Sequence, residues 1–259
     1  MMKTTAALAL LALSATLAQG QSIELHHYAE ALYRKNGDYW WGSTQSGSDP
    51  SYLATYGVSE TGYSQALVSG EATFGRMSGS GSVVARADAG DFASAMAWLD
   101  DSSVYDSLTI HSAVLPTGTP VMLEVTMDLW SLQLNAGAGQ AVTGWASCGF
   151  DKPNFLTIQI EGAVQQSQTG LCRSAVGETM PFRTVLYGRS TADAYDGSSQ
   201  TRSFTAVANF SVRMVTEGAG FTSASGFTYA NPVPEPASAA LLLGGLALLG
   251  LRRCRCKCH

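Results

Sequence analysis

The sequence predicts an all-β fold, a β-sandwich or jelly-roll-like exported domain, from three observations. Charged residues make up only 14% of the 259 residues, while glycine is abundant at 27 residues. Short segments of apolar and small residues recur along the chain, separated by clusters of Gly, Ser, Asp and Pro. No long segment in the central part of the chain reads as a helix. This composition suits many strands joined by tight turns, whereas a helical bundle would be richer in Glu, Lys and Leu.

Strands are expected where apolar residues recur at every second position. The clearest is 121–130, where Val121, Leu123 and Val125 alternate with more polar residues after a turn at 115–120. This period of two predicts one buried and one exposed wall. Further strands are expected, in chain order, at 23–35, 65–74, 82–87, 104–110, 155–161, 182–189 and 203–215. A turn is expected at 196–199, and the run 78–82 is interpreted as a Gly/Ser-rich break between strands.

Residues 1–18 have the features of a secretory signal peptide. Lys3 precedes an apolar run at 6–13, and Thr16-Leu17-Ala18 places small residues before a cleavage point. The apolar run is too short for a stable membrane span. We therefore expect residues 19–232 to form one exported β-sandwich domain, which is long enough for a single sizeable core.

Charge argues against a nucleic-acid partner. Between Gln19 and Val233 the chain has 19 acidic and 10 basic residues, a balance of −9, and no basic stripe with interleaved aromatic residues. Nucleic-acid binding depends on neutralising phosphates, so this acidic body is not expected to bind nucleic acid.

Two cysteines lie in the expected exported domain. Cys148 and Cys172 would meet an oxidising compartment, where two cysteines most often pair, so we expect a disulfide between them. Two separate buried thiols are the alternative.

The C-terminal part, 233–259, predicts a membrane anchor. Residues 237–251 carry no charge and would form a helix about 22 Å long, which is short against a hydrocarbon thickness of about 30 Å. Arg252, Arg253 and Arg255 follow, and snorkelling of such side chains can extend the span. These basic residues should keep 252–259 on the cytoplasmic side, with the body across the membrane. A hydrophobic helix packed on the body is the alternative.

The triplet Pro234-Glu235-Pro236, then 237–251 with Gly244-Gly245, then Arg252-Arg253, resembles the PEP-CTERM protein-sorting domain. The resemblance covers about the last tenth of the chain and is specific because three features occur in order. It implies an exported protein of a Gram-negative bacterium, held in the inner membrane with a periplasmic body. It also implies that an exosortase recognises the triplet and removes the tail, leaving the body at the cell surface or in an exopolysaccharide matrix, as in biofilms.

The tail departs from the Arg-rich ending typical of that family. Cys254, Cys256, Cys258 and His259 alternate with basic residues, but their spacing is unlike that of zinc sites. We expect no metal and no cofactor.

No catalytic arrangement is recognisable, and we expect a protein that is not an enzyme. The sequence has no His-Glu-x-x-His helix, no Gly-x-Ser-x-Gly elbow and no phosphate-binding loop. Asp100, Asp101 and Asp106 lack the spacing of a calcium loop and are expected in a solvated acidic turn.

Tyr39, Trp40 and Trp41 are the candidates for glycan contact, because aromatic rings stack on the apolar faces of sugars. In a strand, Trp40 would point away from Tyr39 and Trp41, so part of this triplet would instead be core. Two functions remain open. The protein is either a non-enzymatic sorting substrate or a carbohydrate-binding module delivered by the same route, with extracellular polysaccharide as its partner.

Overall fold

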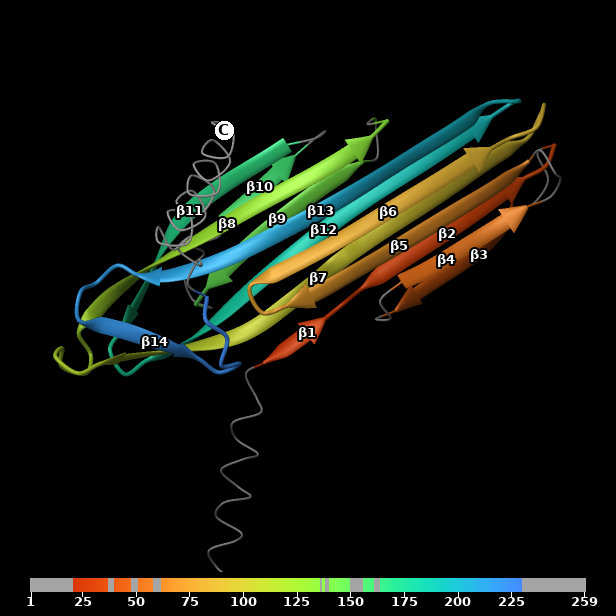
Figure 1. The fold of residues 1–259 in the computed structure, drawn as a ribbon. Coiled ribbons are helices and arrows are strands. Elements are labelled where there is room, and N and C mark those ends of the chain that lie inside the picture. The colour runs from red at the N-terminus through yellow and green to blue at the C-terminus, as the bar shows by residue number, and fades with distance from the viewer. Residues whose placement is uncertain are drawn as a thin grey trace, which may run out of the picture. The chain divides into compact units, whose positions relative to one another are not determined.

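The computed structural model describes residues 21–36, 40–47, 51–57, 62–135, 137, 140–149, 156–160 and 164–229. Two antiparallel sheets face each other, and every regular element among these described residues is a strand (Figure 1). The predicted all-β sandwich is therefore confirmed for this part of the chain. The segments 1–18 and 237–251, expected to be a signal peptide and a membrane helix, lie outside the described residues.

One sheet has eight strands. Six of them follow the order β10-β9-β12-β7-β2-β3, and β1 and β14 also pair with β7. The strands are β1 (Ser22–Glu24), β2 (His27–Arg34), β3 (Trp40–Gly47), β7 (Phe92–Ser112), β9 (Ala141–Cys148), β10 (Leu156–Ile160), β12 (Thr179–Tyr195) and β14 (Ala219–Ser223). The 21-residue β7 organises this sheet, because one edge of it pairs in turn with β2, β1 and β14 while the other pairs with β12.

The second sheet has six strands in the order β11-β8-β13-β6-β5-β4. They are β4 (Ser51–Gly57), β5 (Tyr63–Thr73), β6 (Arg76–Arg86), β8 (Pro120–Leu134), β11 (Val164–Ala175) and β13 (Ser199–Met214). The chain crosses from β12 to β13 through the predicted turn. There Asp196 and Gly197 have φ values of 45° and 79°, a left-handed conformation that an Asp-Gly pair adopts readily.

The core lies between the inner walls of the two sheets. It is rich in alanine, at positions such as Ala29, Ala95 and Ala206, with larger side chains such as Leu99 and Phe204 between them. Small residues at facing positions let the sheets approach, and larger side chains fill the remaining space.

Several expected strands agree with the structure, and three expectations need correction. Strand β8 has the predicted two-residue period, with Val121, Leu123 and Val125 buried. The segment 23–35 is two strands, β1 and β2, that pair with different parts of β7. The run 78–82 lies in the middle of β6, where its serines and glycines alternate between the two faces of the sheet. Its interpretation as a Gly/Ser-rich break between strands was therefore wrong.

The third correction concerns the acidic segment. Asp100 lies within β7, and Asp106, also in β7, is only 2% exposed, so this segment is not a solvated turn. Among the residues that the structure describes, none belongs to a helix long and apolar enough to cross a bilayer.

Candidate functional site

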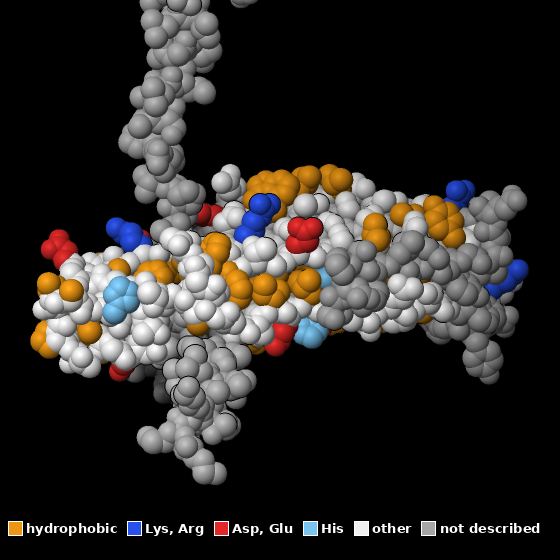
Figure 2. All heavy atoms as spheres, turned by 60° about the horizontal axis from the view of Figure 1, so that its bottom comes forward, with side chains coloured by type: hydrophobic (Ala, Val, Ile, Leu, Met, Phe, Trp, Pro, Cys, Tyr) orange, Lys and Arg blue, Asp and Glu red, His pale blue; other side chains and the backbone are white. Residues whose placement is uncertain are grey.

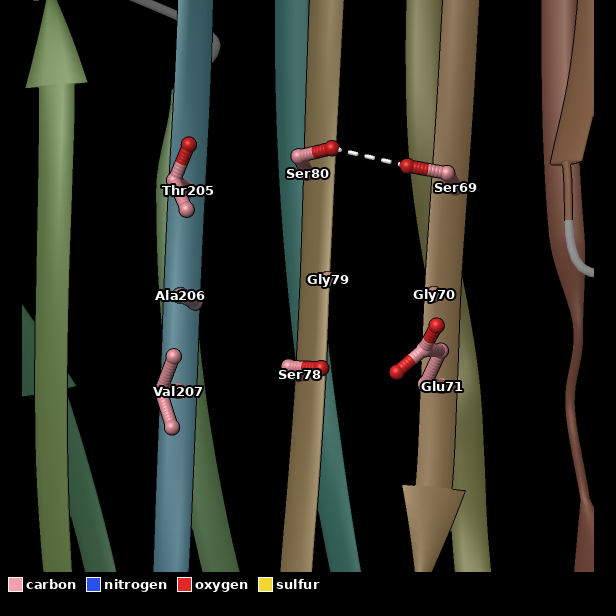
Figure 3. A pocket seen from close by; sticks show the side chains of 9 residues that line it. All are labelled: Ser69, Gly70, Glu71, Ser78, Gly79, Ser80, Thr205, Ala206 and Val207. Atoms are coloured by element: carbon pink, nitrogen blue, oxygen red, sulfur yellow. Dashed lines mark hydrogen bonds between the residues drawn. The ribbon is translucent and has the colours of Figure 1, made fainter.

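A depression of about 490 Å³ lies on the outer face of the six-stranded sheet (Figure 3). Three neighbouring strands, β5, β6 and β13, each contribute three consecutive residues. The lining residues are Ser69, Gly70, Glu71, Ser78, Gly79, Ser80, Thr205, Ala206 and Val207. Strand alternation turns the first and third residue of each set of three toward solvent and the second residue toward the core.

The strand register arranges the outward side chains in two rows. Thr205, Ser80 and Ser69 are directly opposite one another across the three strands, and Ser69 Oγ and Ser80 Oγ are hydrogen-bonded at 2.8 Å. Val207, Ser78 and Glu71 form the second row. Both rows are visible in Figure 3, with the middle residues between them.

The second residues of the three sets, Gly70, Gly79 and Ala206, explain why this part of the six-stranded sheet is close to the eight-stranded sheet. Gly70 and Gly79 are directly opposite each other, and a Cβ at either position would collide with the Leu99 side chain of β7. A larger residue would force Leu99 to shift, so the close approach of the opposite sheet favours glycine at both positions. The sequence signal for this arrangement was the alternation of serine and glycine in 78–82.

An exposed apolar stripe borders the depression on β8. Trp130, Leu132 and Leu134 are 42%, 37% and 53% exposed, while the intervening Ser131 and Gln133 are buried. The usual inside–outside pattern is thus inverted over the end of this strand. Trp130 is directly opposite Val207 of the depression, so the stripe and the depression form one surface.

The outer face of the eight-stranded sheet carries aromatic residues of a different kind. The Arg183 guanidinium carbon lies 4.8 Å from the ring centroids of both Tyr105 and Trp145. Trp98 is half-buried, and Arg189 lies 5.9 Å from its ring centroid. These rings are already in contact with cations of the protein, whereas no ring or cation contact involves Trp130 among the described residues.

The segment at the end of the described chain is fixed to the sandwich by Asp106. Its carboxylate accepts hydrogen bonds from Ser225 N at 3.1 Å, Ser225 Oγ at 2.6 Å and Tyr229 Oη at 2.9 Å. Burial raises the pKa of the Tyr229 hydroxyl, and the neighbouring Asp106 raises it further. The Tyr229 ring also packs edge-on against Phe182, with ring centroids 5.2 Å apart.

Cys148 and Cys172 form a disulfide bridge in the structure, with their Cα atoms 6.2 Å apart. Cys148 ends β9 in the eight-stranded sheet and Cys172 lies in β11 of the six-stranded sheet, so the bridge joins the two layers. Both cysteines are buried at the edge of the core.

Replacing both Cys148 and Cys172 with Ser is expected to lower the free energy of unfolding by about 3 kcal/mol, because the bridge closes a loop of about 25 residues in the unfolded chain. Denaturant unfolding of oxidised wild-type protein and of the double variant measures this difference. Dithiothreitol should reproduce the loss in the wild type and change the double variant little. If alkylation of the native protein labels both thiols without reductant, the alternative of two separate thiols would be correct.

The other sequence-predicted site residues are only partly described. Trp40 and Trp41 open β3, the edge strand next to β2, where they are paired with Arg34 and Tyr33. Tyr39 lies outside the described residues, as do the triplet Pro234–Pro236 and the basic residues Arg252, Arg253 and Arg255. Sequence reasoning missed Trp130 and the hydroxyl-lined depression as a surface, because it did not show which strands are neighbours.

No group of three or more His, Cys, Asp or Glu side chains is arranged to hold a metal ion within the described parts of residues 21–229. His26 is exposed on the surface, but the adjacent His27 at the start of β2 is buried.

The fold defines an all-β sandwich protein, and the C-terminal sequence adds a sorting signal. The family model described as PEP-CTERM protein-sorting motif matches residues 232–255. The chain therefore carries a PEP-CTERM sorting motif at its C-terminal end, as the resemblance of Pro234-Glu235-Pro236 and the residues that follow predicts. No curated protein matches the sequence.

Solved structures with distant similarity include TmCBM61 in complex with β-1,4-galactotriose, at 14% identity and a TM-score of 0.20, covering 57% of this chain and 88% of that chain. A structure of carbohydrate-binding modules from the β-sandwich superfamily has 10% identity and a TM-score of 0.19, covering 72% of this chain and 84% of that chain. The infectious bursal disease virus Gx strain structure has 9% identity and a TM-score of 0.16, covering 90% of each chain. Similarities this weak identify neither a ligand nor a partner for this chain.

Proposed function

We propose that this protein is an exported, non-enzymatic β-sandwich that is sorted through its C-terminal motif. An N-terminal signal peptide at 1–18 directs export. Residues 237–251 hold the precursor in the inner membrane as a single span, with the sandwich in the periplasm and 252–259 in the cytoplasm. An exosortase-type enzyme then recognises Pro234-Glu235-Pro236 and removes the tail, and the sandwich is displayed at the cell surface or in an exopolysaccharide matrix.

The match of the sorting motif to residues 232–255 is the observation that carries this proposal. Two features of the described chain are consistent with it. The described strands, the buried core residues and the Asp106 contacts all lie at or before Tyr229, ahead of the residues that match the motif. The bridge between Cys148 and Cys172 suits an oxidising compartment outside the cytoplasm.

The intact mass of the protein recovered from its native host, with its C-terminal peptide sequenced, tests the proposal. The expected result is a new N-terminus near Gln19 and a C-terminus near 234–236, with the hydrophobic segment absent. A full-length C-terminus at His259 in the membrane fraction would contradict processing and would leave a simple anchored protein.

A second candidate function is a carbohydrate-binding module delivered by the same route. The observation that favours it is the hydroxyl-lined depression beside the exposed Trp130, in which Glu71 is the one ionisable lining residue. The aromatic residues Tyr39, Trp40 and Trp41 remain a separate candidate contact for the same class of ligand.

A further inference from the structure

We propose that the outer face of the six-stranded sheet binds an uncharged polysaccharide, which lies across the strands from Trp130, over the depression, to Glu71. This inference rests on the second candidate function and gives it a site, a direction and a ligand class. It does not depend on the sorting proposal, because binding by the purified chain requires no processing.

The strand register places the residues of this site in one line. Trp130 of β8 is directly opposite Val207 of β13, Val207 is opposite Ser78 of β6, and Ser78 is opposite Glu71 of β5. Adjacent strands are about 4.8 Å apart, so the line is about 14 Å long. It can accommodate a short run of sugar rings placed perpendicular to the strands.

The second row supplies hydrogen-bonding groups along the same direction. Thr205, Ser80 and Ser69 each carry a hydroxyl that can donate one hydrogen bond and accept two. The Ser69–Ser80 hydrogen bond uses part of this capacity and fixes the two side chains. Sugar hydroxyls have the same dual character, so a row of short side-chain hydroxyls matches a polyhydroxylated chain without requiring charge.

The apolar component is provided by Trp130 and by Leu132, two residues further along β8. Both are more than a third exposed, although the residue between them, Ser131, is fully buried. An exposed apolar group rimmed by polar residues is typical of a contact surface. The indole face can cover the apolar face of a sugar ring while its N–H remains available to a hydroxyl.

The charges favour an uncharged ligand over a polyanion. Glu71 is the one ionisable side chain among the nine lining residues. No Lys or Arg lines the depression, so it offers no cation to a carboxylate or sulfate group of an acidic polysaccharide. Figure 2 shows one face of the molecule, on which charged side chains are sparse and uncharged atoms predominate.

Native affinity electrophoresis of the full chain in detergent, through gels containing galactan, mannan, dextran or xyloglucan, tests the site. Retardation by at least one of these uncharged polysaccharides is expected, with little retardation by alginate, a polyanion. Trp130→Ala and Ser80→Val should each weaken binding about tenfold or more, equivalent to about 1.4 kcal/mol. Ser80→Val acts by removing a hydroxyl, so it tests the polar row independently of the ring.

Leu171→Ala is the matched control for loss of an exposed apolar side chain. Leu171 is 48% exposed on the same sheet but pairs with Glu124, about 20 Å along β8 from Trp130. Its binding should equal that of the wild type, and all variants should unfold at the wild-type temperature.

Four results would overturn the inference. These are no retardation by any uncharged polysaccharide, stronger retardation by alginate, unchanged binding by folded Trp130→Ala, and light scattering that shows a dimer which Trp130→Ala dissociates. Binding abolished by Trp40→Ala or Trp41→Ala but retained by Trp130→Ala would place the contact at β3 instead. None of these results bears on removal of the tail, so failure of this inference and failure of the sorting proposal are distinguishable.

Discussion

Replacing Glu235 with Ala is expected to leave the hydrophobic tail attached to an otherwise normally exported protein. In the proposed sorting route, the triplet is what the processing enzyme recognises, whereas export depends on residues 1–18. In the sequence Glu235 stands between two prolines, each of which restricts its own φ, and the residue before a proline is disfavoured in the helical conformation. We expect the tailless form to fall from the predominant species to a minor one.

The measurement is the ratio of tailless to full-length protein in the native host, by intact mass of membrane and extracellular fractions. Glu217→Ala is the matched control, since Glu217 is an exposed glutamate of the body and lies before the motif. It should be processed like the wild type. If the Glu235→Ala protein still loses its tail, Pro234-Glu235-Pro236 is not the recognition element, and sorting of this chain would need a different explanation.

Replacing Asp106 with Ala is expected to give the largest loss of stability among single polar substitutions in the sandwich. The carboxylate is 2% exposed and accepts hydrogen bonds from Ser107 N, Ser225 and Tyr229. Alanine would leave the buried Tyr229 hydroxyl and the part-buried donors of Ser225 without this acceptor, each costing about 1–3 kcal/mol where water cannot replace the lost partner. We expect a loss of about 3 kcal/mol, since local rearrangement would admit water to some of these groups.

Chemical unfolding followed by tryptophan fluorescence measures this loss. Tyr229→Phe removes one hydroxyl from the same cluster and should cost about 1 kcal/mol. Tyr195→Phe is its matched control, because Tyr195 is 58% exposed, and it should be neutral. An Asp106→Ala protein as stable as the wild type would show that the segment containing Ser225 and Tyr229 is not held by this carboxylate in solution.

The sandwich could be predicted in outline because strands leave a local signal. In β8, alternate residues from Val121 to Leu129 are apolar, and each apolar residue is buried as that period requires. The Asp196-Gly197 turn was also predictable, because an Asp-Gly pair readily adopts the left-handed backbone found there. Residues 78–82 were misinterpreted, since glycine and serine favour turns in isolation. Only the side chains of Leu99 near Gly79 and of Phe204 near Gly81 explain glycine within that strand.

The candidate binding surface could not be predicted because it depends on strand order. Trp130 and Glu71 are far apart in the chain, and they share one line only because β8, β13, β6 and β5 are successive neighbours. Asp106 was misplaced for a related reason. An aspartate in a polar stretch of sequence is expected to be solvated. The structure instead brings Ser225 and Tyr229, distant in the chain, into hydrogen bonds with the Asp106 carboxylate.

The sequence by itself determined the all-β class and the C-terminal sorting motif, because alternation, turn residues and an ordered triplet–apolar–basic signal are all encoded by neighbouring positions. Only the tertiary structure decided which strands are adjacent and which glycines leave room for the Leu99 side chain. It also decided that the exposed ring of Trp130 lies beside the row of hydroxyls formed by Thr205, Ser80 and Ser69. Those features arise from contacts between segments distant in the chain, and the packing of two sheets selects them from many pairings that the local pattern allows equally well.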